Sequence, residues 1–272
     1  MSEPARAAVP VDEAVSALEA WVGQNFGIRY GADQRGLFAG RIAALSRDLN
    51  VPPVIILTRV VSGDRTTIVR LGEAVSTNHT LFFREDEIFD YLAGEIIPRM
   101  PPGPTRVWSA ATSSGDEAYS LAIAFLEAWG PAAAARVRIL GTDLSERQVR
   151  AAEAAVYPQP QLQRLSPDRR KRWFHPAGLG QFAVGAEARG LCTFRRFNLT
   201  QSPWPFEQRF HLIFLRNVLY YFEPDVRRKV VESCFDAAEP GAWLVTSLTE
   251  PMLDLTTRWT AVRPAVFRRG PG

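Results

Sequence analysis

The chain has 272 residues, of which 46% are hydrophobic and 22% charged, and its formal net charge at pH 7 is +3. This composition is typical of a globular protein, long enough for one large domain or two unequal ones. No apolar run approaches the ~20 residues that span a membrane, and the first residues lack the charged and apolar blocks of a signal peptide. We therefore expect a cytoplasmic protein without membrane insertion.

Residues 1–75 have the spacing of a small helical domain. Apolar residues recur at helical steps in residues 11–24 and again in residues 33–50, which places them on one face of each helix. Residues 52–63 and 66–75 favour two further short helices. The expected buried positions are Val11, Val15, Leu18 and Val22 in the first helix and Leu37, Ile42, Leu45 and Leu49 in the second.

Strands alternate with helices after the loop "MPPGP" at 100–104. The expected strands are 105–110, 136–143, 210–217 and 242–248, and the expected helices are 117–129, 145–157 and 224–238, with Ser145 as an N-cap. This rhythm predicts a parallel, doubly wound α/β sheet in a domain of residues 76–272. Glycine turns and short alternating stretches predict a small antiparallel insert at about 173–197.

The charge distribution and the cysteine spacing indicate which ligands and partners to expect. Residues 1–100 carry 10 basic and 13 acidic side chains, and the remaining residues are net positive. The dense basic run "DRRKRW" at 168–173 is either a solvated face or a partner-docking surface. We expect no nucleic-acid binding, because there is no recognition motif and no ladder of aromatic and basic residues. Cys192 and Cys234 lack metal-ligand spacing, so no metal site is expected.

Ligands of such sheets bind beyond the carboxyl ends of the strands. The loop 110–117 follows the first strand, with Gly115 as its one glycine and no phosphate-binding lysine. Its carboxylates, Asp116 and Glu117, would repel a phosphate but suit a cationic ligand, although they are also explained by a favourable interaction with the helix dipole. Asp143 ends the second strand, where a carboxylate can accept from a ribose diol. A nucleoside with a positive charge, S-adenosylmethionine, fits both positions.

Five segments occur together and in order: "TNHTLFFRE" (77–85), "WSAATSSGDEAYSLAI" (108–123), "ILGTDLS" (139–145), "FRRFNL" (194–199) and "FHLIFLRNVLYYF" (210–222). Together they resemble the chemotaxis receptor methyltransferase (CheR) family over most of the chain. The resemblance implies an all-α N-terminal domain followed by a Rossmann-like methyltransferase domain with a small β-insert. It also implies methyl transfer from S-adenosylmethionine to glutamate side chains of a methyl-accepting chemoreceptor or related signalling protein. S-adenosylhomocysteine would be the product, with no metal, and the protein is expected to be a monomer.

The resemblance also implies site residues at the matching positions. Arg84 and Tyr221 would be catalytic, near the transferred methyl group. The implied cofactor-binding residues are Asn78, Thr80, Arg84, Ala110, Glu117, Asp143, Asn198, Leu199, Arg216 and Asn217. Within this set, Glu117 would bind the methionine end of the cofactor and Asp143 its ribose. The chain by itself also allows Tyr221 as a packed aromatic residue and Arg84 as a partner of a neighbouring carboxylate.

Glutamate is ionised at neutral pH, so the expected reaction needs no general base, and the three histidines, His79, His175 and His211, form no catalytic pattern. The N-terminal domain departs from the family, because the stretch "FAGRIAALSRDLN" (38–50) offers only Arg41 and Arg47 where the family has a notably basic helix. The acceptor could therefore be a divergent receptor or another signalling protein, and the β-insert could supply the docking surface. Two alternatives remain: a cofactor-binding signalling module without catalysis, and a small-molecule carboxyl methyltransferase, which the extra domains disfavour.

Overall fold

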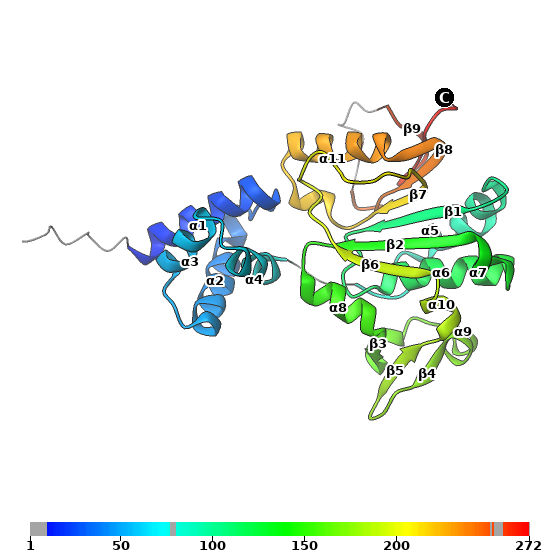
Figure 1. Ribbon diagram of the computed structural model, residues 1–272, viewed down its shortest axis with the longest axis horizontal. Helices are drawn as coiled ribbons and strands as arrows, with labels where there is room; N and C mark the ends of the chain where they lie inside the picture. Colours follow the sequence, from blue (N-terminus) through cyan, green and yellow to red (C-terminus); the bar gives the residue numbers. More distant parts are fainter. Residues whose placement is uncertain (1–9, 77–79, 251, 253–257, 272) are drawn as a thin grey trace, which may run out of the picture. The chain divides into compact units, whose positions relative to one another are not determined.

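The computed structural model describes residues 10–76, 80–250, 252 and 258–271, apart from the side chain of Ala32. It divides into two compact units (Figure 1). The first takes in the N-terminal helices together with Tyr221–Glu223, and the second contains the remaining described residues. Tyr221–Glu223 joins the first unit because the Arg29 N–H donates to the Tyr221 carbonyl at 3.0 Å and Ile28 pairs with Phe222 in an antiparallel bridge.

The first unit is built from four helices: α1 (Val11–Phe26), α2 (Arg35–Leu49), α3 (Pro53–Val61) and α4 (Arg65–Val75), with a short 3-10 turn, η1 (Ala32–Gln34), before α2. Caps define several helix ends: Gly27 and Asn50 take left-handed conformations after α1 and α2. The Asp64 carboxylate caps the start of α4 by accepting from the Thr67 N–H at 2.7 Å.

The buried faces of these helices differ in part from the expected ones. Leu18 and Val22 of α1 and Ile42 and Leu45 of α2 are buried, as predicted. Val11 is 60% exposed and Leu37 is 51% exposed, and Ala14 and Phe38 fill the core in their place. Val11 is the first residue of α1, so no earlier helical turn covers its side chain. In α2 the buried face runs through Phe38, Ile42 and Leu45, so it begins one residue after Leu37.

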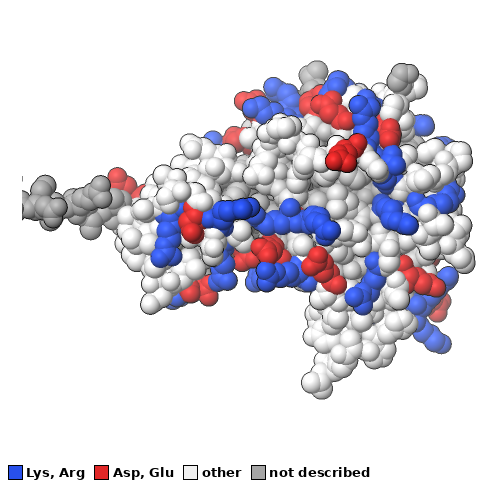
Figure 2. Space-filling view, viewed as in Figure 1, with Lys and Arg blue, Asp and Glu red and all other residues white. Residues whose placement is uncertain are grey.

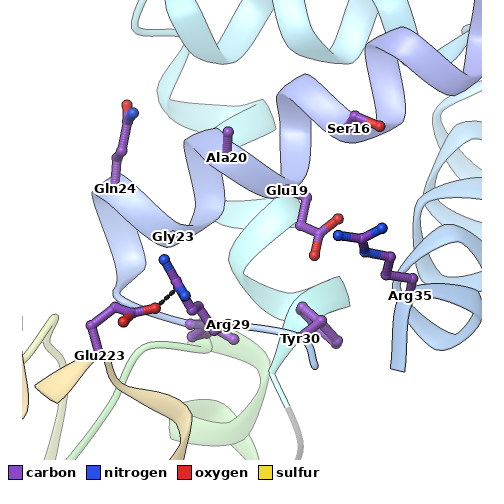
Figure 3. A pocket seen from close by; sticks show the side chains of 10 residues that line it. Ser16, Glu19, Ala20, Gly23, Gln24, Arg29, Tyr30, Arg35 and Glu223 are labelled. Atoms are coloured by element: carbon purple, nitrogen blue, oxygen red, sulfur yellow. Dashed lines mark ion pairs between the residues drawn. The ribbon is translucent and has the colours of Figure 1, made fainter. Parts of the chain in front are cut away.

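A groove of about 680 Å³ lies along α1 in the first unit. Figure 3 shows its floor on α1 and a charged rim, with Arg29 paired to Glu223 and Glu19 facing Arg35. The rim therefore carries both signs of charge, in agreement with the absence of a dominant basic run in this part of the sequence.

The second unit is centred on a seven-stranded sheet in the order β6-β2-β1-β7-β8-β10-β9. Its strands are β1 (Thr105–Ala110), β2 (Val137–Asp143), β6 (Cys192–Arg196), β7 (Phe210–Leu215), β8 (Ala238–Val245), β9 (Thr260–Arg263) and β10 (Val266–Arg268). The first five strands in this order pair in parallel, and β10 and β9 add an antiparallel edge. The predicted parallel α/β sheet is confirmed, and the antiparallel edge was not anticipated.

The sheet is covered on both sides, as β1 illustrates. Successive side chains of a strand point to opposite faces. Ser109 faces α6, where its hydroxyl donates to Glu117 at 2.8 Å. Trp108 faces the other way and lies within 4.9–6.0 Å, between ring centroids, of an aromatic cluster formed by Phe197, Trp204, Phe206 and Phe210. Residues 197–206, which lie between β6 and β7, therefore cover this face at Trp108.

The helices of the second unit are α5 (Asp86–Tyr91), α6 (Asp116–Trp129), α7 (Ala132–Arg136), α8 (Glu146–Ala154), α9 (Pro167–Trp173), α10 (Ala186–Arg189) and α11 (Pro224–Asp236). Short turns of other helical types occur at η2 (Leu92–Ile96), η3 (Ile97–Arg99), η4 (Gln159–Leu162) and η5 (Leu219–Tyr221). Ser145 is the N-cap of α8, as predicted, and its hydroxyl accepts from the Gln148 N–H at 3.3 Å. Within the described ranges, no helix combines the length and apolar character that a membrane crossing requires.

The antiparallel insert differs from the expected 173–197. A three-stranded sheet in the order β3-β5-β4 forms from β3 (Val156–Pro158), β4 (Phe174–Pro176) and β5 (Gln181–Val184). The helix expected over 145–157 ends at Ala154, because Ala155 turns left-handed and the chain becomes β3. Residues Cys192–Arg196 form β6, which extends the main sheet beside β2. Short alternating stretches have the same pattern in either sheet, so only the pairing partner separates them.

The basic run at 168–173 lies in α9, and part of it is structural. Arg169 forms a fork with both carboxylate oxygens of Glu127 and stacks over the Phe83 ring at 4.1 Å. The β4–β5 hairpin that follows carries no Lys, Arg, Asp or Glu, and Figure 2 shows it as an uncoloured projection. The predicted docking role of this region stays a prediction.

Candidate functional site

Parallel pairing brings the ends of three strands to one edge of the sheet. Ala110 of β1 is level with Thr142 of β2 and with Leu215 of β7. The loop 111–115 follows β1, Asp143 is the last residue of β2, and Arg216–Asn217 follow β7, so these residues meet at this edge. This is the edge at which doubly wound sheets bind ligands.

The loop after β1 has an unusual backbone. Ala111, Ser113 and Gly115 take positive φ angles of 66°, 52° and 91°. Glycine is required at position 115 because a Cβ there would lie 2.8 Å from the Ala152 side chain. Left-handed residues other than glycine concentrate here and at Phe83, Glu85 and Asn217. Such conformations cost about 1–3 kcal/mol each and often mark functional sites.

Asp143 ties this loop to the end of β2. Its carboxylate accepts from the Ser113 N–H at 2.8 Å and from the Ser145 N–H at 2.9 Å. The side chain is buried, and burial raises its pKa to about 6 against the opposing main-chain hydrogen bonds. Each carboxylate oxygen has a second lone pair, so Asp143 can also accept from a ligand. The loop and Asp143 therefore form one unit.

Arg216 is the centre of a buried ion network. Its Nη1 donates to Glu117 at 2.9 Å, and its Nη2 donates to the Arg84 carbonyl oxygen at 2.6 Å and lies 3.3 Å from Glu85. Arg216 is 4% exposed, so these partners compensate a charge that is almost wholly removed from water. The network joins the end of β7 to the first turn of α6 and to the segment that carries Arg84.

The two carboxylates of this network differ in their pKa values. Burial raises the pKa of Glu117, against the Arg216 guanidinium and the Ser109 hydroxyl. Burial also acts to raise the pKa of Glu85, but Arg216 together with the Ser247 hydroxyl and the Leu248 N–H outweighs it and lowers the pKa. Glu85 is therefore firmly ionised at neutral pH, and it also connects the network to the segment after β8.

A second buried carboxylate, Glu250, holds the segment after β7. It accepts from the Asn217 N–H at 2.8 Å and from the Leu219 N–H at 2.6 Å. Asn217 has a φ of 57°, and its side-chain amide donates to Glu85 at 3.5 Å. The sequence "RNVL" is therefore shaped by carboxylates from distant segments.

Asp116 is the most enclosed acidic residue of the site, with 0% exposure. Burial raises its pKa to about 6, while the Ser114 hydroxyl donates to it at 2.7 Å. Gln161 of η4 also donates to it at 3.4 Å. Asp116 therefore points into the protein, whereas its neighbour Glu117 takes part in the ion network.

The structure brings together most of the predicted cofactor residues that it describes. Ala110 ends β1, and Glu117, Asp143, Arg216 and Asn217 lie at the same edge. Asn198 and Leu199 follow Phe197, the first residue after β6. The Phe197 N–H donates to the Asp143 carbonyl at 2.8 Å and so holds the start of this segment beside the end of β2. The Asn198 side chain accepts from the Thr200 N–H at 3.0 Å, and Leu199 is buried.

For three further predicted positions, Asn78, Thr80 and Tyr221, membership of this edge stays a prediction. Asn78 lies outside the described residues, as does His79. Thr80 is described and half-buried at the start of the segment that leads to Arg84. Tyr221 ends η5 and belongs to the first unit, so its predicted role beside Arg84 stays a prediction. His211 lies within β7, as predicted, and its Nδ1 accepts from the Arg106 N–H at 3.1 Å.

Sequence reasoning missed Glu85 and Ser109 and gave Glu250 no role in the site. Glu85 lies beside Arg84 in the quoted motif, and Ser109 lies two residues before the loop, so the signal for both is their position next to predicted site residues. The signal for Glu250 is weaker, because its partners lie about 30 residues earlier in the chain.

Several buried polar atoms at this edge have no hydrogen-bond partner within the described part of the chain. They are the hydroxyl oxygens of Thr112, Ser113 and Thr246 and the Nε of Arg216. Most buried polar atoms in proteins are paired, so a cluster of unpaired ones needs an explanation. A polar ligand that binds beyond these strands would supply the missing partners.

A family model described as "CheR methyltransferase, SAM binding domain" matches residues 78–266. The chain belongs to the CheR methyltransferase family. Chemotaxis protein methyltransferase 1 of Vibrio cholerae is 34% identical over 244 residues, 87% of this chain and 88% of the relative. Chemotaxis protein methyltransferase 1 of Pseudomonas aeruginosa is 31% identical over 254 residues, 89% of this chain and 92% of the relative. Chemotaxis protein methyltransferase of Borreliella burgdorferi is 28% identical over 249 residues, 87% of each chain.

Membership of the CheR family confirms the predicted resemblance and the predicted fold class. The matched region covers six strands of the sheet and the first residue of β10, and the edge described above falls inside it. The family is one of methyltransferases, and the matched domain is its binding domain for S-adenosylmethionine.

Proposed function

We propose that this CheR-family chain methylates glutamate side chains of a chemoreceptor or a related signalling protein, with S-adenosylmethionine as the methyl donor. The products would be glutamate methyl esters and S-adenosylhomocysteine. The observation that carries the proposal is the bond from Arg216 to the Arg84 carbonyl oxygen at 2.6 Å. It fixes the segment of Arg84 at the edge of the sheet where the cofactor residues gather.

The donor set at this edge suits S-adenosylmethionine. Asp143 offers carboxylate lone pairs for ribose hydroxyls, and the unpaired hydroxyls of Thr112 and Ser113 offer further polar contacts. Glu117 adds an acidic side chain to the site, in keeping with a cationic ligand. Gly115 lets the loop pack closely against Ala152 and Tyr157, which a Cβ at this position would meet. We assign Asp143, Ala110, Asn198 and Leu199 to the nucleoside and Glu117, with Arg216 behind it, to the methionine end.

When bound, S-adenosylmethionine supplies an electrophilic methyl group on a positively charged sulfur. The chain's own contribution is to orient the acceptor and exclude water. The acceptor glutamate is already ionised at neutral pH, with a free pKa of about 4.3, so no residue must remove a proton. This agrees with a site built from carboxylates and guanidinium groups, without a histidine among its described members.

Arg84 is the residue we assign to the acceptor. A guanidinium is planar and matches a carboxylate, so it can hold one carboxylate oxygen while the other attacks. Its main chain is held on two sides, because the Phe83 N–H donates to the Ser120 hydroxyl at 2.9 Å and the Arg84 carbonyl accepts from Arg216. Alignment of this kind is worth several kcal/mol and up to about 7–11 in ideal cases. Tyr221 is proposed to orient the acceptor from the other end of "RNVLYYF".

The test is methyl transfer from radiolabelled S-adenosylmethionine to membranes that contain a methyl-accepting chemoreceptor. We expect label in the receptor band and its release as methanol in mild base, which identifies a carboxyl methyl ester. Label on small molecules would instead indicate a small-molecule methyltransferase. Binding of S-adenosylhomocysteine without any transfer would indicate a signalling module that lacks catalysis. Either result would overturn the proposal.

A further inference from the structure

The loop 112–116 needs support from outside itself. Ser113 and Gly115 take left-handed conformations, and the loop has only one internal main-chain bond among those described, from the Gly115 N–H to the Thr112 carbonyl at 3.1 Å. Its first half is held by the end of β2: the Thr112 N–H donates to the Thr142 carbonyl, and the Ser113 N–H donates to the Asp143 carboxylate. Its second half, around Ser114, is held by a different part of the structure.

The three-stranded sheet holds the second half of the loop. Tyr157, in the middle of β3, donates its hydroxyl to the Ser114 carbonyl oxygen at 2.6 Å. A Cβ at Gly115 would lie 3.1 Å from the same hydroxyl, so the tyrosine is in close contact with the loop. Gln161 of η4 adds a longer bond, at 3.4 Å, to Asp116. Residues 157–161 therefore contact the half of the loop that β2 does not hold.

Tyr157 also contacts the segment that leads to Arg84. Its ring meets the Phe82 ring edge-on, with centroids 4.9 Å apart, and Phe82 in turn meets Phe174 of β4 at the same distance. Tyr157 is 2% exposed, and burial raises the pKa of its hydroxyl well above the ordinary value. The hydroxyl therefore stays protonated and remains a donor at all physiological pH values.

We propose that Tyr157 is a positioning residue, which holds the loop 112–116 in its cofactor-binding conformation and so makes the three-stranded sheet part of the cofactor site. This inference rests on the proposed cofactor site. It gives the small sheet a role inside the enzyme, in addition to any surface it presents to a partner.

The chain contains a matched control. Tyr119 is also buried, and its hydroxyl also donates to a main-chain carbonyl, that of Ala152 at 2.8 Å. Ala152 lies on α8 and not in the loop. Tyr157→Phe and Tyr119→Phe therefore each remove one buried hydrogen bond to a main-chain carbonyl, and only the first of these bonds is made to the loop itself.

The experiment measures S-adenosylhomocysteine binding to the full chain by calorimetry, with thermal unfolding of each variant alongside. We expect Tyr157→Phe to weaken binding roughly three- to tenfold, the range that one hydrogen bond supplies, and Tyr119→Phe to change it less than about twofold. In the ligand-free protein, Tyr157→Phe should also speed hydrogen exchange at residues 113–116. Turnover at saturating donor should stay near the wild-type value, so that the effect falls on KM.

Wild-type affinity in Tyr157→Phe would overturn the inference, and so would an equal loss in both variants, which would indicate general loosening. Should Tyr157→Phe fail to fold, Gln161→Ala decides: weaker binding supports the inference and unchanged binding overturns it. A wild-type protein that does not bind S-adenosylhomocysteine overturns the proposed function, and this inference with it.

Discussion

Arg216 and Glu117 form a buried ion pair, with Nη1 and the carboxylate oxygen 2.9 Å apart and both side chains largely removed from water. The pair links the end of β7 to the first turn of α6, across 99 residues of sequence. Glu85 approaches the same guanidinium from the segment after Arg84, at 3.3 Å. One arginine therefore sets the relative positions of three segments that the proposed reaction needs.

Removal of Arg216 should be costly. Arg216→Leu leaves Glu117 and Glu85 without their counter-charge in the interior, and we expect the free energy of unfolding to fall by about 3–5 kcal/mol. Urea unfolding measures this. Arg150→Ala is the control, because Arg150 and Glu146 form an exposed pair on α8 that is worth about 0.5 kcal/mol or less. A loss in Arg216→Leu no larger than in the control would show that the network does not stabilise the fold.

Arg84→Ala should separate binding from turnover. We expect S-adenosylhomocysteine affinity close to that of the wild type, and turnover at saturating donor and acceptor lower by roughly 100-fold or more, because the acceptor carboxylate loses its alignment. Radiolabel transfer measures turnover and calorimetry measures affinity. Arg99→Ala serves as the control, since Arg99 forms an exposed pair with Glu95. Unchanged turnover in Arg84→Ala would remove Arg84 from the catalytic assignment.

Cofactor affinity should depend on pH through Asp143. Burial raises its pKa to about 6, and only the ionised carboxylate can accept from the Ser113 and Ser145 N–H groups and from a ribose at once. Affinity for S-adenosylhomocysteine should therefore fall as pH drops from 7 to 5, by up to roughly tenfold. Asp116 has a similar pKa, so the measurement is repeated in Asp116→Asn. Loss of the pH dependence in that variant would assign it to Asp116 instead.

Asp116 should affect the pH dependence of stability. Burial raises its folded-state pKa from 3.8 to about 6, so the folded protein binds this proton more tightly than the unfolded chain. Its favourable contribution is complete below the unfolded pKa and is lost as pH rises through 6. From pH 4 to pH 7, wild-type stability relative to Asp116→Asn should fall by about 2 kcal/mol.

Urea unfolding of both proteins at several pH values in that range tests this expectation. Asp168→Asn, at an exposed position in the first turn of α9, is the control and should follow the wild type. A constant difference between wild type and Asp116→Asn across the range would contradict the raised pKa.

Interactions between residues close in sequence allowed much of this fold to be predicted from the sequence. Apolar residues at helical spacing located α1 to α4, and the alternation of apolar strands with helices after residue 104 indicated a parallel sheet. Ser145 was identified as a helix cap because a capping side chain acts on the third residue after it. The motifs that resemble the CheR family are continuous stretches, so they too were visible without a structure.

Only the tertiary structure decided which distant segments meet. β6 has the pattern of a strand in either sheet, and its pairing with β2 placed it in the larger one. Glu85 accepts from Ser247 and Leu248, more than 160 residues away, and Tyr157 donates to Ser114, 43 residues before it. Local propensity acts over a few residues, whereas burial of a charge or a hydroxyl is satisfied by whichever groups the packed chain brings within about 3 Å.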